Sequence, residues 1–132
     1  YAREMGAALL RVLVSFERLI DPGELAGIKL MTNDLERDWC VDGCRRVNLD
    51  PGYIAAGKLV LATTKDQAHR IYLERGVYAE VTLAWRDGDY RAWPWTYPDY
   101  ASEAYLAILR RMRARYMEQL RERGLLRPAP QE

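Results

Sequence analysis

The sequence predicts an α+β fold, in which an antiparallel sheet of about five strands packs with two main helices at about residues 22–39 and 100–123. Short runs in the middle of the chain alternate apolar and polar residues, which is typical of half-buried strands. The two flanking segments carry apolar residues at helical spacing and begin at capping residues. At 132 residues, 49% of them hydrophobic, we expect a single domain over residues 1–126.

The first element is ambiguous. Residues 10–20 (LRVLVSFERLI) fit both a strand alternation and a helical stripe, and their β-branched content favours a strand. A helix should begin after Asp21, because Pro22 suits the first helical position and Glu24 stands three residues after the cap. Gly43 should end this helix, whose expected apolar face consists of Leu25, Ile28, Met31, Leu35 and Trp39.

The sheet should follow this helix. Asp87 and Gly88 form the strongest hairpin signal in the chain. The predicted strands around it are residues 45–49, 58–64, 69–73, 76–85 and 89–95. Either Asp99 or Ser102 caps the last helix, whose apolar positions are Leu106, Leu109, Met112, Tyr116 and Leu120. Two prolines in residues 127–132 predict a disordered tail.

Several classes of protein are disfavoured by the composition. The longest uncharged apolar runs are far shorter than the ~20 residues needed to span a bilayer, and no signal peptide is visible, so we expect a cytoplasmic protein. The motifs GxxxxGK[ST], GxGxxG and HExxH are absent. Cys40 and Cys44 do not complete a four-ligand zinc site with the single His69, and we expect both to be reduced and partly buried.

Polar residues gather at strand ends and turns. The connection from Lys65 to Arg70 holds the only histidine and contains no glycine, proline or asparagine, so a role beyond a simple loop is expected. Glu80 lies within an aromatic strand, where it either faces solvent or needs a cation, which Arg70 or Lys65 would supply. Each residue also has a structural explanation as a cap or a solvated strand end. The expected ligand-binding residues are Asn48, Asp50, Lys58, Lys65, Asp66, His69, Arg70, Tyr72, Glu80, Tyr97 and Asp99.

The segments RRVNLDPGYI, KLVLATTKDQAHRIYL, GVYAEVTLAW and WTYPDY resemble, in that order, domain-of-unknown-function family 4416 of bacteria. The likeness extends over roughly residues 4–120 through EMG, SFERLIDP and IKLMTNDLE. It implies a strand and a helix ahead of EMG, which agrees with a chain that begins at Tyr1 without a methionine. Members sometimes carry the label GTP-binding protein, and no catalytic residue is implied. The family's fixed stretches fall on Asn33, Glu36, Asn48, Asp50, Gly52, Tyr53, Lys65, Asp66, His69, Arg70, Tyr72, Glu80, Thr96, Tyr97, Pro98 and Asp99.

The first functional hypothesis is a module that binds a phosphorylated small molecule, in particular a nucleotide. Tyr72 or Tyr97 would stack on a base, and Asp50 would accept a hydrogen bond from a ribose or base donor. The cations that would neutralise phosphate are Lys58, Lys65 and Arg70.

Two alternatives stay open. One is an enzyme acting on a phosphoester, in which His69 is the acid or base and a divalent metal ion is held by Asp50, Glu80 and Asp99. Its candidate catalytic residues are therefore His69, Asp50 and Glu80. The other is an RNA- or protein-interaction module built on the arginine-rich helix at residues 110–123, because residues 107–127 contain seven arginines and only two acidic residues.

Overall fold

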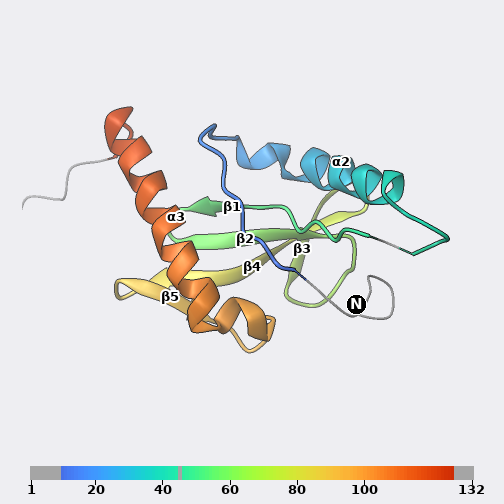
Figure 1. Ribbon diagram of the computed structural model, residues 1–132. Helices are drawn as coiled ribbons and strands as arrows, with labels where there is room; N and C mark the ends of the chain where they lie inside the picture. Colours follow the sequence, from blue (N-terminus) through green and yellow to red (C-terminus); the bar gives the residue numbers. More distant parts are fainter. Residues whose placement is uncertain (1–9, 45, 127–132) are drawn as a thin grey trace, which may run out of the picture. The chain divides into compact units, whose positions relative to one another are not determined.

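The computed structural model describes residues 10–44 and 46–126, and it confirms the α+β fold (Figure 1). Two α-helices accompany a five-stranded antiparallel sheet. The elements in chain order are the 3-10 helix η1 (Pro22–Glu24), α2 (Leu25–Asp38), β1 (Gly52–Ala55), β2 (Lys58–Thr63), β3 (Arg70–Glu74), β4 (Val77–Arg86), β5 (Asp89–Ala92), the 3-10 helix η2 (Pro98–Ala101) and α3 (Glu103–Glu122).

β4 is the strand on which the sheet is organised. The strand order is β1-β2-β4-β3, and β5 also pairs with β4. Arg70 lies opposite Glu80 in the β3–β4 pair, and Tyr90 lies opposite Trp85 in the β4–β5 pair. The predicted hairpin at residues 87–88 is confirmed, since Asp87 and Gly88 both have the positive φ angles (52° and 75°) that a type I′ turn requires.

Two predicted strands are wrong. Residues 10–20 form neither strand nor helix, and the side chains of Leu10, Val12 and Phe16 are 95%, 77% and 80% exposed. A strand exists only when a neighbour pairs with it, and no strand of the described chain pairs with this segment. Residues 46–49 are also irregular, and the next strand, β1, begins only at Gly52. The predicted tail at residues 127–132 lies outside the described residues.

The predicted start of the first helix is confirmed, and its predicted apolar face is only partly buried. Asp21 and Glu24 form a complete capping box around η1. Leu25 of the predicted face belongs to the core, but Met31 and Trp39 are 55% and 54% exposed. Apolar periodicity alone therefore identifies only part of the buried side of the helix, which also includes two charged residues. The buried residues of α2 are Leu25, Ala26, Lys29 and Glu36.

The described residues divide into two compact units. The first unit comprises the chain up to Tyr53 together with Val60–Val81, and the second comprises Ile54–Leu59 together with the chain from Thr82. The core of the first unit is Leu25, Ala26, Val60, Ala62 and Val77. Buried side chains of the second unit include Leu59, Leu83, Ala84, Tyr90 and Leu109. The expectation of a single domain stays a prediction.

Gly52 allows β1 to approach β2 closely. A Cβ atom at this position would overlap the backbone oxygen of Val60 and would lie 2.7 Å from Cδ2 of Leu61. Because one of these obstacles is backbone, the neighbour cannot simply rotate away. Gly52 also follows directly on the irregular segment that carries Asn48 and Asp50, so its close approach fixes where that segment ends.

Replacing Gly52 with alanine should lower the free energy of unfolding by about 1–3 kcal/mol, because the strands must separate to admit the methyl group. Denaturant titration followed by circular dichroism measures this change. Gly57→Ala is the matched control, because a Cβ at Gly57 would meet open space. Equal stability of the two variants would show that the close approach is not real.

Candidate functional site

A buried carboxylate on β4 joins two basic side chains at the start of β3. Glu80 is only 8% exposed, and its Oε1 atom lies 2.8 Å from His69 Nε2 and accepts a hydrogen bond of 3.2 Å from Arg70 Nε. The register of the sheet explains the contact, since Arg70 and Glu80 are direct cross-strand partners. The predicted ion pair between Glu80 and Arg70 is therefore confirmed.

The guanidinium of Arg70 is held at a second point. Its Nη1 atom donates a 3.0 Å hydrogen bond to the carbonyl oxygen of Lys65, and the Arg70 backbone N–H donates to the carbonyl of Gln67. The connection before β3 thus folds back on the arginine, and the side chains of Lys65 and Asp66 stay exposed. Arg70 Nη2 forms no hydrogen bond with any residue of the described chain.

Tyr72 extends the same face of β3. Side chains two residues apart on a strand share a face, so Tyr72 lies beside Arg70. Its ring makes an edge-to-face contact with Tyr78 (centroids 5.2 Å apart), and its hydroxyl accepts a hydrogen bond of 3.2 Å from the Gly76 N–H. The ring is nevertheless 56% exposed. This combination of fixed orientation and exposure suits a stacking surface.

A second group in the first unit holds the residues before β1. The Leu49 N–H donates to Glu36 Oε1 (3.1 Å), and the Leu49 carbonyl accepts from Lys29 Nζ (3.4 Å). Both charged side chains come from the buried face of α2 and replace the backbone partners that a strand would provide. Asn48 and Asp50 lie on either side of Leu49 and are joined by a 3.1 Å hydrogen bond.

Lys29 was missed by sequence reasoning, and Glu36 was named only through the family resemblance. The available signal was their spacing, because residues seven apart lie on one face of a helix. A lysine and a glutamate on the face that also carries Leu25 and Ala26 indicate a charged pair that contacts the fold. The usual assumption that charged helix residues face water conceals this signal.

The other predicted ligand-binding residues belong to the second unit. Lys58 is the exposed first residue of β2, and Tyr97 precedes η2 with 56% of its surface exposed. Asp99 lies in η2, and its backbone carbonyl accepts hydrogen bonds from Ser102. Ser102, one of the two predicted caps, is the residue that caps α3. The candidate site is therefore the group around Glu80 in the first unit.

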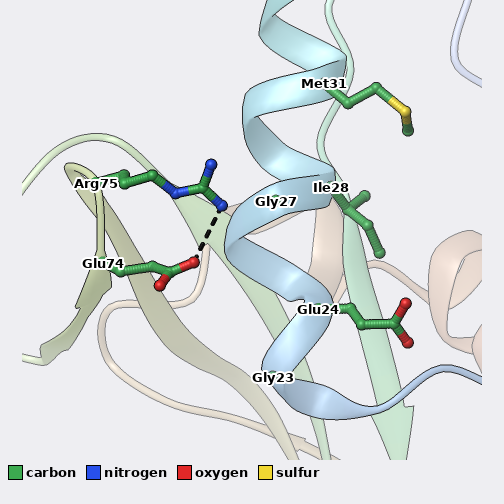
Figure 2. A pocket seen from close by; sticks show the side chains of 7 residues that line it. All are labelled: Gly23, Glu24, Gly27, Ile28, Met31, Glu74 and Arg75. Carbon is green, nitrogen blue, oxygen red and sulfur yellow. Dashed lines mark hydrogen bonds and ion pairs between the residues drawn. The ribbon is translucent and has the colours of Figure 1, made fainter.

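A shallow hollow in the first unit contains none of the predicted site residues. It has a volume of about 320 Å³ and lies between the start of α2 and the turn that joins β3 to β4 (Figure 2). Gly27 provides part of its floor, Ile28 and Met31 line one side, and the ion pair of Glu74 with Arg75 (3.0 Å) lines the other. It has an apolar wall but no cluster of converging polar groups.

The two cysteines are exposed, which corrects the expectation that they are partly buried. They lie at the end of α2, where Val41 and Cys44 exchange two backbone hydrogen bonds around a tight turn at Asp42 and Gly43. All four residues of this turn are exposed. Both thiols are free, and within residues 10–44 and 46–126 no three His, Cys, Asp or Glu side chains are grouped to hold a metal ion.

Two of the arginines on α3 are committed to the fold of the second unit. Arg110 donates to Asp89 (2.8 Å) and to Glu103 (2.6 Å), and these hydrogen bonds hold the pKa values of both carboxyls below their ordinary values. Arg113 donates to the carbonyl of Ala56 and stacks on Trp85, with 3.8 Å from its Cζ to the ring centroid. Both guanidiniums therefore already have partners within the second unit.

Arg110 should make the stability of the chain sensitive to acid. The pKa values of Asp89 and Glu103 are lowered from 3.8 and 4.5, so their contribution is present above those values and is lost as the pH falls through the folded-state pKa values. In Arg110→Gln, the thermal midpoint should therefore fall less between pH 6 and pH 3 than in the wild type. Arg111→Gln should keep the wild-type pH dependence. Identical pH profiles for the Arg110 variant and the wild type would contradict this prediction.

Removing the charge of Glu80 should be costly for folding. Glu80→Gln should lower the free energy of unfolding by about 2 kcal/mol, because two basic groups lose a charged acceptor in a mostly buried place. Glu118→Gln, which loses an exposed partner of Arg115, should cost less than about 0.5 kcal/mol. Urea denaturation of both variants makes the comparison, and similar costs would mean that the Glu80 contacts are solvated.

Comparison with known proteins places the chain in an uncharacterised group. The model of the family described as "Domain of unknown function (DUF4416)" matches residues 1–116. No curated protein and no solved structure matches the chain. In the part of the chain that the structure describes, no helix is long and apolar enough to cross a membrane.

Proposed function

The chain belongs to this family of domains of unknown function, and from its site we propose that it is a small binding module for a phosphorylated ligand. The observation that carries the proposal is the single oxygen, Glu80 Oε1, that both His69 and Arg70 contact. A carboxylate placed behind an arginine fixes the guanidinium before any ligand arrives, and a fixed guanidinium loses less entropy when it binds an anion.

The charges around the site favour an anion. Arg70 and Lys65 carry two positive charges against the two negative charges of Glu80 and Asp66. Glu80 is only 8% exposed, so the accessible part of the site has one more positive than negative group. Lys65 is exposed, and its backbone carbonyl accepts a hydrogen bond from Arg70. The Lys65 ammonium and the Arg70 guanidinium therefore belong to the same connection. Asp66, also exposed, would accept a hydrogen bond from a hydroxyl or amine of the ligand.

Tyr72 supports a nucleotide in particular. Two residues along a strand cover about 7 Å, so a phosphate at Arg70 would place the attached nucleoside over the exposed ring of Tyr72. Base stacking on an aromatic ring contributes about 1–3 kcal/mol. We therefore propose that the ligand is a nucleotide whose phosphate binds at Arg70 and Lys65. We also propose that the protein is cytoplasmic.

The contact between His69 and Glu80 favours a second candidate, an enzyme that acts on a phosphoester. A carboxylate 2.8 Å from an imidazole orients the ring for proton transfer, which is the task of a general acid or base. The metal-dependent form of this hypothesis has less support. Glu80 Oε1 already contacts two basic side chains, and the other proposed ligands, Asp50 and Asp99, are assigned to different units.

Arg70→Ala should strongly weaken binding of the phosphorylated ligand with only a modest loss of stability, because Glu80 keeps its contact with His69. A thermal-shift screen of nucleotides and sugar phosphates on the wild type identifies the ligand, and titration calorimetry then compares the variants. The loss of one charge-assisted contact corresponds to a Kd raised on the order of 10–100-fold. Tyr72→Ala should weaken nucleotides more than sugar phosphates.

Arg111→Ala is the matched control, since it removes one exposed arginine that makes no ion pair with a described residue. The proposal fails if no anionic compound stabilises the wild type. It fails equally if Arg70→Ala unfolds the protein, because Arg70 would then be a structural residue.

A further inference from the structure

The hairpin of β4 and β5 presents a cationic and aromatic surface that the proposed ligand site does not use. The guanidinium carbon of Arg86 lies 5.6 Å from the ring centroid of Trp93. The rings of Trp93 and Trp95 are stacked, with centroids 5.0 Å apart and planes inclined by only 8°. All three residues belong to the second unit, so this surface can be described without reference to the first.

Strand alternation separates this surface from the core of the second unit. Trp85 and Tyr90 are cross-strand partners, and Trp85 lies under Arg113 of α3. Arg86 and Arg91 are their next neighbours in the chain and therefore project to the opposite face. A 3.3 Å hydrogen bond from Arg91 Nε to the Arg86 carbonyl keeps the two arginines together, and both are exposed.

The charge of this surface is not balanced by ion pairs. Neither Arg86 nor Arg91 forms a salt bridge with a residue of the described chain. The pKa of Asp89 is lowered mainly by its hydrogen bond to Arg110, and the charge of Arg91 is the smallest of the causes that lower it. The exposed Asp87 occupies the turn itself. Both guanidiniums are therefore available to bind an anionic group of a partner molecule.

The aromatic part of the surface is held in place by the hydrogen bonds of the turn at residues 93–96. The backbone N–H of Trp93 donates to Thr96 Oγ1 (2.8 Å), and the backbone N–H of Thr96 donates to the Trp93 carbonyl (3.1 Å). Thr96 Oγ1 in turn donates to the Thr82 carbonyl on β4 (2.6 Å). This turn fixes the stacked rings, and 37% of the surface of Trp95 is nevertheless exposed.

We propose that the surface formed by Arg86, Arg91, Trp93 and Trp95 binds single-stranded nucleic acid. Bases stack on the exposed indole, and the two arginines contact the phosphates on either side. A base stacks on an aromatic ring only when it is unpaired, which favours a single strand over a duplex. An acidic peptide would satisfy the arginines but would leave the exposed ring unused.

This inference moves nucleic-acid binding away from α3, where the sequence alone suggested it. Arg110 and Arg113 are bound to Asp89, Glu103 and Ala56. The surface on the hairpin combines two exposed arginines with stacked indole rings, and it stands independently of the phosphorylated-ligand site. Arg70→Ala should therefore leave its binding unchanged, which separates the two proposals experimentally.

The test uses the full chain and a fluorescein-labelled uridine oligonucleotide of about 12 nucleotides, with binding followed by anisotropy at several salt concentrations. Trp95→Ala should raise Kd about tenfold, and Trp95→Phe should recover most of the affinity because it keeps an aromatic face. Arg86→Gln with Arg91→Gln should raise Kd and reduce the slope of log K against log salt by about 1.4. Circular dichroism and thermal unfolding check that each variant is folded.

The matched control is Arg121→Gln with Arg123→Gln, which removes the same charge from the exposed end of α3. This variant should keep the wild-type affinity and salt slope. The proposal is overturned if the control loses as much affinity as the hairpin variant, or if Trp95→Ala binds as the wild type does. Absence of binding at low salt, or equal competition by polyglutamate, would also overturn it.

Discussion

The negative charge of Glu80 must be neutralised within the sheet, and much of the first unit is arranged around that requirement. Glu80 belongs to β4, and only 8% of its surface is exposed, so its carboxylate is mostly withdrawn from water. Arg70 supplies the neutralising charge from β3, and His69, directly before that strand, contacts the same carboxylate oxygen. Arg70 in turn holds the carbonyl of Lys65, and the connection before β3 takes its shape from that contact. An isolated buried carboxylate would cost several kcal/mol.

Local chemistry decided which features could be predicted from the sequence. The cap at Asp21, the turn at Asp87 and Gly88, and the pairing of Glu80 with Arg70 each depend on residues that are close in the chain or directly opposed on adjacent strands. Residues 10–20 could not be predicted in this way, because their state depends on whether another strand accepts them. The buried face of α2 was predicted only in part for a related reason. Lys29 and Glu36 are buried because they bind the backbone of Leu49.

The arginines illustrate how little a count of charges reveals. Residues 107–127 contain seven arginines and only two acidic residues, yet Arg110 and Arg113 are bound within the second unit. Arg86 and Arg91 stand outside that region and are left exposed on the hairpin. Their difference arises from strand alternation and from the position of α3, neither of which is visible in net charge. The functional meaning of an arginine therefore depends on which carboxylates and carbonyls the fold brings within its reach.

The free edge of β3 has a consequence for how the protein behaves at high concentration. Among the described strands, β3 pairs only with β4, and its Ile71 and Leu73 side chains are 70% and 40% exposed. An unpaired apolar edge is a template for a further strand, and residues 10–16 have the alternation of one. A ligand bound at Arg70 would occupy the start of that same edge. Bound ligand would then reduce association of chains through this edge, and the ligand-free chain would aggregate more readily.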